Sequence, residues 1–267
     1  MTDTPKSHGR KSITASLKPR DLMQDNRLAD AWTAQVMTLF PQSFPGVLGE
    51  SLTGKALKDG LWQLEAIDLR PFGIGKHRNV DDTPAGGGAG MVLRADVVSA
   101  AVEHARRISR NPLPLLYLSP RGRPFDQATA RRFAAGPGLT LLCGRFEGVD
   151  QRVLDHYSFE EISLGDFVLT GGEIAAQAMI DATVRLLPGV LGNAASAEEE
   201  SFSNGLLEHP HFTKPAEWQG HKIPDVLMSG HHGEIEKWRR AQSEEITRIR
   251  RPDLWTRLLA KREAEKG

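Results

Sequence analysis

Cysteine is almost absent from this sequence, because the 267 residues contain only Cys143. A single thiol cannot build a disulfide framework or a multi-cysteine metal site, so the chain is expected to work in a reducing cytoplasm. Cys143 stands within an apolar run, which favours an inert thiol in the core over a reactive nucleophile.

An excess of either charge is also missing, since Lys and Arg together number 34 and Asp and Glu number 34. The summed field therefore does not indicate a polyanionic partner, and any contact with nucleic acid must come from local patches. The apolar runs fall well short of the roughly 20 residues that span a bilayer, and the polar N-terminus lacks the apolar core of a secretory signal. We therefore expect a soluble, cytoplasmic protein without a membrane partner.

The sequence lacks the common signatures of nucleotide and metal sites. No G-x-G-x-x-G opens a helix after the first predicted strand, and there is no G-x-x-x-x-G-K-[ST]. The glycine-rich residues 86–90 lack the lysine and the preceding strand of a phosphate cradle, so a flexible loop facing the substrate is favoured. His209 with His211, and His231 with His232, lack partners at zinc-ligand spacing, so no metal site is expected.

Short β-type runs alternate with helical patterns along most of the chain, which predicts an α/β domain with a largely parallel sheet. The predicted strands are 34–39, 61–69, 115–118, 139–143 and 167–169, and the predicted helices between them are 94–110 and 126–134.

A further helix is predicted over 173–187, before Pro188 and Gly189. Its apolar stripe is expected at positions four residues apart, which are Ile174, Ala178, Ala182 and Leu186.

The composition divides the chain into four parts. Residues 1–31 are basic and polar, which is typical of a flexible tail; an auxiliary RNA-contacting arm is the alternative. Residues 32–191 form the α/β domain, and 192–204, which are small, polar and acidic, are an interdomain linker. Residues 205–267 are predicted to be a small helical domain, with charged helices over 232–251 and 252–266.

Three glycine-containing loops follow predicted strands, at 119–122, 144–148 and 169–173. In open α/β sheets the loops at the carboxyl ends of the strands converge and bind ligands. Glycine lets the backbone approach a ligand closely. Three such loops predict a binding crevice for a ligand without phosphates, held by backbone groups.

A series of motifs occurs in one order from about residue 35 to residue 252. They are TLFP (38–41), DD (81–82), GGGAGM (86–91), YLSP (117–120), GRFEGVD (144–150), GDFVLTGGE (165–173), PGVLG (188–192), GLL (205–207) and PHF (210–212). Together they closely resemble the bacterial tRNA (guanine-N1)-methyltransferase family, TrmD type, of the SPOUT superfamily.

The resemblance implies a SPOUT methyltransferase domain with a deep C-terminal trefoil knot, a rare exception to the rule that chains do not thread their own loops. It also implies a homodimer with the active site between subunits, and methylation of N1 of the guanine at tRNA position 37 with S-adenosylmethionine. The cofactor residues that it implies are Tyr117, Leu118, Ser119, Pro120, Gly144, Glu147, Leu164, Gly165, Asp166, Phe167, Val168, Leu169, Gly171 and Gly172.

Two residues match the catalytic positions of the family. Glu200 stands where the family typically has the aspartate of an Asp-Ser-Phe sequence, the general base supplied by the partner subunit, and glutamate reaches one methylene further. The alternative is that this residue and the glutamates at 198 and 199 only solvate the linker. Arg185 matches the catalytic arginine, but an i, i+4 surface ion pair with Asp181 is a competing interpretation.

The remaining predicted site residues have several interpretations. Glu147 faces the cationic end of the cofactor, binds magnesium through water, or caps the following helix. Family positions on the substrate side are Asp81, Gly90, Glu208 and His211. Basic residues that offer local tRNA contacts are Arg70, Lys76, His77, Arg78, Lys237, Arg239, Arg240, Arg248, Arg250 and Arg251.

Three rival functions differ in class. A non-catalytic RNA-binding module would keep the fold without the chemistry, with Glu200 as its sign. A SPOUT enzyme that methylates ribose 2′-oxygens is disfavoured by the 86–90 loop and by the Glu200-Ser201-Phe202 sequence. A dinucleotide oxidoreductase is disfavoured by the missing fingerprint.

Overall fold

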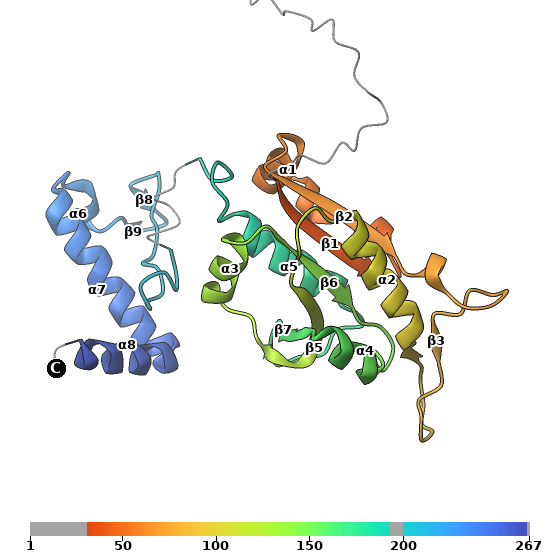
Figure 1. Cartoon of the computed structure of the whole chain (residues 1–267). Coiled ribbons are helices and arrows are strands. Elements are labelled where there is room, and N and C mark those ends of the chain that lie inside the picture. Colours follow the sequence, from red (N-terminus) through yellow and green to blue (C-terminus); the bar gives the residue numbers. More distant parts are fainter. Residues whose placement is uncertain (1–30, 193–199, 266–267) are drawn as a thin grey trace, which may run out of the picture.

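The computed structural model describes residues 31–192 and 200–265. Its centre is a five-stranded parallel sheet in the order β2-β1-β6-β5-β7 (Figure 1). The strands are β1 (Trp32–Thr38), β2 (Trp62–Asp68), β5 (Leu115–Pro124), β6 (Gly138–Cys143) and β7 (Glu160–Ser163). The prediction of an α/β domain with a parallel sheet is confirmed.

The middle strands are apolar because helices cover both faces of the sheet. Every residue of β6 is buried, and six of the seven residues of β1 are buried. Cys143 lies at the end of β6, and burial raises the pKa of its thiol well above the ordinary value. This confirms the prediction of an inert core thiol.

Helices on the two faces of the sheet create two hydrophobic cores. One core lies against α1 (Ser51–Lys58), α3 (Gln127–Ala134) and α5 (Glu173–Val184). The other lies against α2 (Ala95–Ile108) and α4 (Gln151–Tyr157). Because side chains alternate along a strand, neighbours such as Val36 and Met37 enter different cores.

The predicted strand at 167–169 is wrong, and β7 takes its place at the sheet edge. Phe167 and Val168 are exposed in a loop, so their apolar character does not reflect burial in a strand. The sequence of β7, Glu-Glu-Ile-Ser, carries charged side chains that an edge strand tolerates. The short helices α1 and α4 were also missed, since each has too few turns to show a clear period.

The predicted apolar stripe of the helix after Gly172 is wrong. The face of α5 that enters the core consists of Ala176, Met179, Ile180 and Val184, while Ile174 is 63% exposed. The helix has apolar residues around most of its circumference, so the pattern alone did not fix which face is buried. The helix also ends at Val184, earlier than predicted.

Small elements connect or follow the main domain. The short segments are η1 (Pro41–Ser43), η2 (Gly46–Gly49), η3 (Arg70–Phe72), β3 (Asp81–Asp82), β4 (Val92–Leu93), β8 (Glu217–Trp218), β9 (His221–Lys222) and α6 (Asp225–Met228). Two longer helices, α7 (His232–Arg250) and α8 (Pro252–Ala264), agree with the predicted C-terminal helices (Figure 1).

Two predicted segments lie largely outside the residues that the structure describes. The tail at 1–31 lies outside the described residues except for its last position, and so does most of the linker at 192–204. Within the described residues, none of the helices combines the length and the apolar character that a membrane span requires.

Candidate functional site

A pocket of about 390 Å³ lies at the carboxyl ends of β5, β6 and β7, where the crevice was predicted. Its walls come from residues 117–121, 144–149, 162–165 and 167–172, with Ala175 at the start of α5. These walls include residues from all three glycine-containing segments that the sequence singled out. The prediction of a loop at 119–122 is wrong, however, because β5 continues through these residues, with an irregular register between Leu118 and Arg123.

Nearly all the cofactor residues that the family resemblance implied line this pocket. All of them line it except Asp166, which is exposed and is not part of the lining. The prediction omitted Arg121, Arg145, Phe146, Gly148, Val149, Ile162, Ser163, Thr170 and Ala175. Most of these stand within or beside the same loops, so the loop boundaries were the signal that could have found them.

The glycines of the pocket are packed against their neighbours. A Cβ atom on Gly172 would lie 2.7 Å from the Cα atom of Cys143, and one on Gly144 would lie 2.9 Å from the ring of Tyr117. The backbone N–H of Gly172 donates to the carbonyl oxygen of Gly144 at 3.1 Å. The loops therefore touch through their backbones, with no room for a side chain between them.

An ion pair between the half-buried Arg145 and the buried Glu173 joins the pocket to the core. The Nη2 atom of Arg145 lies 2.7 Å from Glu173 Oε2, and the hydroxyl of Thr38 donates to Glu173 Oε1 at 2.6 Å. Arg145 Nη1 also donates to the carbonyl oxygen of Thr170, and its guanidinium stacks on the ring of Phe40. This network fixes the end of β1, the loop after β6 and the start of α5 to one another.

Glu147 is the acidic side chain of the pocket wall. Arg121 and Arg145, which share that wall, are paired with Glu161 and Glu173, whereas Glu147 has no ion-pair partner among the described residues. The alternative that Glu147 caps the following helix is wrong, because the Asp150 carboxylate caps α4 by accepting from Arg152 N–H. The pocket therefore offers one unpaired negative charge.

The glycine-rich loop at 86–90 reaches this acidic side chain. A Cβ atom on Gly90, where φ is +87°, would come within 2.5 Å of the Glu147 side chain. The backbone N–H of Glu147 donates to the carbonyl oxygen of Met91 at 2.9 Å. Gly90 thus forms part of the rim beside Glu147, on the substrate side that the resemblance implied.

Arg185 and Glu200 form a two-contact ion pair. Arg185 Nη1 donates to Glu200 Oε2 at 2.6 Å, and Nη2 also contacts Oε1. Hydrogen bonding to the Arg185 guanidinium holds the pKa of the Glu200 carboxyl below its ordinary value and raises the pKa of Arg185. The competing pairing of Arg185 with Asp181 is not the one formed, since the Asp181 carboxylate accepts from the hydroxyl of Thr53.

This ion pair and the pocket lie at opposite ends of α5. Gly172 and Ala175 line the pocket at the N-terminal end of the helix, and Arg185 follows its last residue. With 12 residues in α5 and a rise of 1.5 Å per residue, the two ends are separated by about 18 Å. Within one chain, Glu200 and the pocket therefore do not form a single site.

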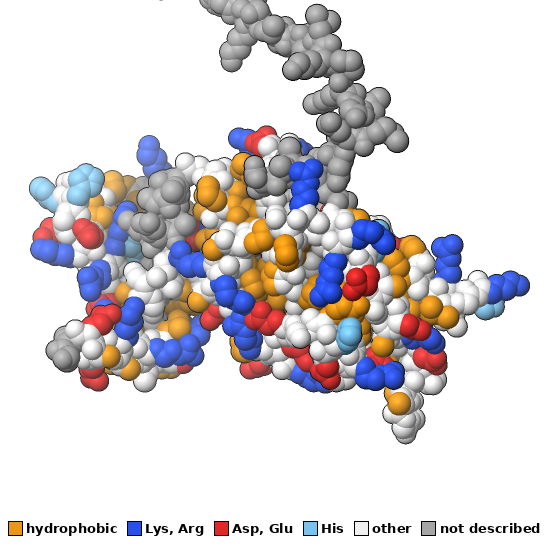
Figure 2. Space-filling view, in the orientation of Figure 1, with side chains coloured by type: hydrophobic (Ala, Val, Ile, Leu, Met, Phe, Trp, Pro, Cys, Tyr) orange, Lys and Arg blue, Asp and Glu red, His pale blue; other side chains and the backbone are white. Residues whose placement is uncertain are grey.

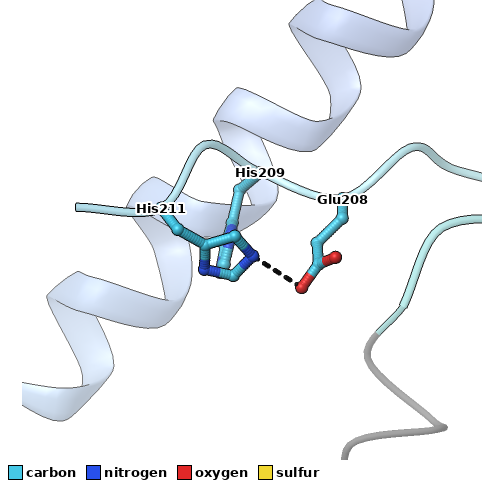
Figure 3. Close-up of side chains that lie close together, drawn as sticks. All are labelled: Glu208, His209 and His211. Atoms are coloured by element: carbon cyan, nitrogen blue, oxygen red, sulfur yellow. Dashed lines mark hydrogen bonds and ion pairs between the residues drawn. The ribbon is translucent and has the colours of Figure 1, made fainter. Parts of the chain in front are cut away.

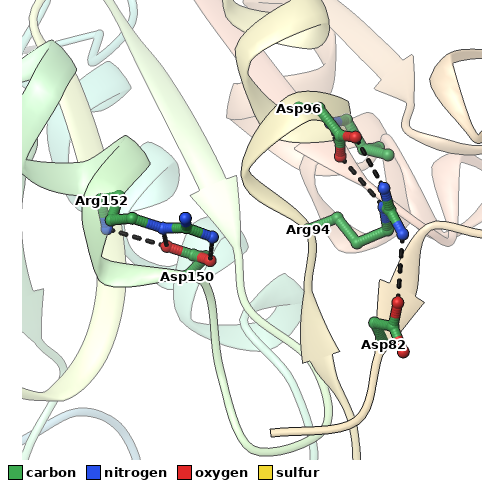
Figure 4. Close-up of polar contacts among 6 residues, drawn as sticks. Asp82, Arg94, Asp96, Asp150 and Arg152 are labelled. Carbon is green, nitrogen blue, oxygen red and sulfur yellow. Dashed lines mark hydrogen bonds and ion pairs between the residues drawn. The ribbon is translucent and has the colours of Figure 1, made fainter. Parts of the chain in front are cut away.

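A second hollow of about 1090 Å³ lies beside β3 and β4. Two groups of charged residues line it, shown in Figure 4: Arg94 binds both Asp82 and Asp96, and Arg152 binds Asp150. Hydrogen bonds from these arginines lower the pKa of Asp96 and of Asp150. Asp81 pairs with Leu93 through the backbone of β3 and β4, beside this hollow.

The two other predicted substrate-side residues contact each other. Glu208 Oε1 and His211 Nε2 are 2.8 Å apart, and His209 lies beside them (Figure 3). The sequence-based interpretation of His209 and His211 overlooked Glu208, which immediately precedes them and supplies a carboxylate. The backbone N–H of Glu208 donates to Ser201 Oγ at 3.0 Å, which connects this group to the segment that carries Glu200.

Comparison with known proteins gives consistent results. The family model described as "tRNA (Guanine-1)-methyltransferase TrmD" matches residues 33–257. A protein of Ruegeria pomeroyi named tRNA (guanine-N(1)-)-methyltransferase is 67% identical over 96% of this chain and 97% of its own length. Proteins with the same name from Ruegeria sp. (strain TM1040) and Rhodospirillum rubrum are 70% and 59% identical, over 88% and 86% of this chain and 96% and 95% of their own lengths.

Proposed function

This chain belongs to the tRNA (guanine-1)-methyltransferase family, TrmD, and methylates guanine in tRNA at N1; we propose that the methyl donor is S-adenosylmethionine and that the target is the guanine at position 37. The observation that carries the proposal is the pocket of glycine-rich loops at the carboxyl ends of β5–β7, whose walls contain nearly all the residues that the family resemblance implied. Its size is within the range of small-molecule sites, about 300–1,000 Å³.

The residues present fit S-adenosylmethionine. The packed glycines give a ligand access to backbone N–H and C=O groups, which suits a ligand without phosphates. The exposed rings of Phe146 and Phe167 offer flat apolar surface, and Glu147 offers a negative charge to the sulfonium or ammonium group. Magnesium bound by Glu147 through water is the alternative assignment for that carboxylate.

We propose that the chain between β7 and α5 forms the trefoil knot. β7 lies at the edge of the sheet, yet α5, which follows it, packs against β1 and β6. To reach them, residues 164–172 cross the carboxyl ends of β5 and β6. The close approach of Gly172 to Cys143 and Gly144 supports a tight passage between these loops.

We propose that the active site is completed by a second copy of the chain. The Arg185–Glu200 pair lies about 18 Å along α5 from the pocket of its own chain, too far for one reaction centre. The outward face of α5 also presents Ile174, and Val47 on the neighbouring η2 is 69% exposed. Figure 2 shows hydrophobic side chains gathered over this part of the molecule, which supports an interface between copies.

In the proposed mechanism, the bound cofactor supplies an electrophilic methyl group. The Glu200 carboxylate of one subunit accepts the N1 proton of a guanine that lies against the pocket of the other subunit. The N1 electron pair would then attack the methyl group that the bound cofactor would supply, with the neutral thioether of the cofactor as the leaving group. Arg185 donates hydrogen bonds to O6, where negative charge develops.

The protonation state of Glu200 is compatible with this role. A glutamate carboxyl is ordinarily ionised at neutral pH, and the hydrogen bonds from Arg185 lower the pKa of Glu200 further. The same ion pair weakens the carboxylate as a base. We therefore propose that the arriving guanine draws the guanidinium toward O6, which raises the basicity of Glu200 when substrate is present.

Contact with tRNA is proposed for cations that are not paired within the chain. Lys76, Arg78, Arg239 and Arg250 are exposed and have no ion-pair partner among the described residues. By contrast, Lys237 and Arg248 on α7 are paired with Glu234 and Glu245. Binding to tRNA should weaken as salt rises, because phosphate contacts release counterions.

Mapping of the product tests the proposal. The protein is incubated with labelled S-adenosylmethionine and an unmodified tRNA transcript that carries guanine at position 37, and the nucleosides are identified by mass spectrometry. We expect 1-methylguanosine at position 37 and none in a transcript with adenine there. A methylated ribose, or methylation at another position, contradicts the proposal, and no incorporation at all would favour the non-catalytic module.

A further inference from the structure

Beyond methyl transfer, the segment after Glu200 carries a group of side chains with the character of a metal site. Glu208, His209 and His211 each offer one ligand atom, and these atoms lie within 4.8 Å of one another. They come from four consecutive positions of the sequence Glu-His-Pro-His, in which the proline restricts the backbone between the two histidines. Figure 3 shows the side chains gathered on one side of this segment, with Glu208 turned toward His211.

One nitrogen atom of this group lacks a hydrogen-bond partner among the residues that the structure describes. The Nδ1 atom of His209 is buried and has no hydrogen-bond partner in the described parts of the chain. Buried polar atoms are nearly always satisfied by protein, water or an ion, so such an atom needs a partner. The hydrogen bond between Glu208 and His211 accounts for those two residues but leaves His209 without one.

We propose that Glu208, His209 and His211 bind a divalent transition-metal ion of the zinc class. Two imidazole nitrogens and one carboxylate oxygen are a ligand set that zinc accepts, and a hard ion such as magnesium prefers oxygen ligands alone. Ligand bonds of about 2.0–2.2 Å bring the three atoms closer than they now stand, which side-chain rotation can achieve. His211 is exposed, so a fourth position is open to water or to a group of the substrate.

The proposed metal site lies between the segment that carries Glu200 and the C-terminal helix α7. Glu208 is attached through its backbone N–H to Ser201, the residue after Glu200. His209 also lines a hollow of about 480 Å³ together with Arg239 and Arg240 of α7. An ion held here would therefore fix the conformation of residues 208–211, which contact the segment that carries Glu200 and lie beside α7.

Metal titration of the untagged full-length protein tests this inference. The protein is stripped with a chelator and titrated with zinc chloride in an isothermal calorimeter. We expect one tight site per chain, retained at millimolar magnesium. The double variant His209→Ala/His211→Ala should lose it, and Glu208→Gln should weaken binding by at least the roughly 10–100-fold typical of perturbed ligand environments.

A matched variant controls for general effects of a histidine substitution on the fold. His221 lies in β9 outside the group and is exposed, so His221→Ala should bind zinc like the natural chain. Circular dichroism of each variant confirms that it is folded. Absence of tight binding, equal binding by the double variant, or displacement of zinc by magnesium overturns the inference. None of these outcomes depends on methyltransferase activity, so the two proposals can fail separately.

Discussion

The two ends of α5 differ in how they are built. At the N-terminal end, backbone and glycine residues form the pocket, and its cations are held in ion pairs such as Arg145–Glu173. At the C-terminal end, the Arg185–Glu200 pair is made of two flexible side chains that are 30% and 25% exposed. The first end carries the pocket proposed for the methyl donor. The second carries the two groups proposed for proton transfer and, among the described residues, does not line that pocket.

Under the proposed mechanism, the N-terminal end of α5 serves binding of the methyl donor and the C-terminal end serves the chemistry. Variants at the glycine-built end should change the affinity for the methyl donor, because the backbone itself is the binding surface. Variants at the charged end should change the rate of transfer and leave that affinity unaltered. Three substitutions test this separation, and a fourth, Asp126→Ala, tests the stability of the fold alone.

Glu200→Gln is expected to have the largest effect. Loss of the general base should lower single-turnover methylation by about 10²–10⁴-fold. Binding of S-adenosylmethionine, measured by calorimetry, should not change, because Glu200 does not line the pocket. Glu200→Asp should keep substantial activity, and Glu103→Gln on the exposed face of α2 is the matched control. A Glu200→Gln enzyme with the natural rate would exclude this residue as the base.

Arg185→Ala is expected to follow, with a loss of about 10²–10³-fold in the rate of transfer, the size seen when one donor to a developing oxyanion is removed. Arg185→Lys keeps the charge but not the two-contact geometry, so it should recover only part of the rate. Rates are compared with melting temperatures. A lower melting temperature with an unchanged rate would mean that the pair only stabilises the fold.

Gly172→Ala should weaken cofactor binding and destabilise the chain. The added methyl group meets the backbone of Cys143 at 2.7 Å, and crowding of this kind typically lowers the free energy of unfolding by about 1–3 kcal/mol. Gly192→Ala is the control, since no atom of the described residues lies within 4 Å of its added Cβ atom. Calorimetry should show reduced affinity for S-adenosylmethionine in Gly172→Ala and natural affinity in Gly192→Ala. Equal affinity in the two variants would show that Gly172 is not part of the binding surface.

Asp126→Ala should have the smallest effect, confined to stability. The Asp126 carboxylate caps α3 by accepting from Thr129, whose hydrogen bonds lower the pKa of Asp126. Loss of the cap should lower the free energy of unfolding by about 1 kcal/mol at neutral pH. The pKa of Asp126 is lower in the folded state than in the unfolded state. The stabilisation by the cap is therefore fully present at a pH above the unfolded-state pKa and is lost as the pH falls through the folded-state pKa. Denaturation at pH 7 and in acid, with Asp59→Ala as control, checks the dependence.

Sequence reasoning succeeded where local chemistry decides the structure. The glycine-containing loops after strands marked the pocket, since a close backbone approach requires glycine at positions such as Gly144 and Gly172. The β-type sequences of β1 and β6, in which apolar residues predominate, likewise predicted strands of the sheet.

Sequence-based prediction failed where contacts between residues far apart in the sequence determine the structure. The buried face of α5 depends on which neighbours the helix meets, and its own apolar residues surround most of the axis. The strand β7 carries two glutamates that find arginine partners on β5, which its own sequence does not show. The Glu208–His211 contact was not predicted, because the spacing of the histidines alone does not show that the Glu208 side chain turns toward them.

The most direct test of the central claim combines two defective chains. Glu200→Gln lacks the proposed base and Gly172→Ala has an impaired pocket, so each alone should be nearly inactive at an S-adenosylmethionine concentration far below the dissociation constant of the Gly172→Ala pocket. If the base of one subunit serves the pocket of the other, random co-assembly of the two chains restores one intact site in each mixed dimer, which is about a quarter of the natural activity. Activity in the mixture no higher than in the separate variants would contradict a site shared between subunits.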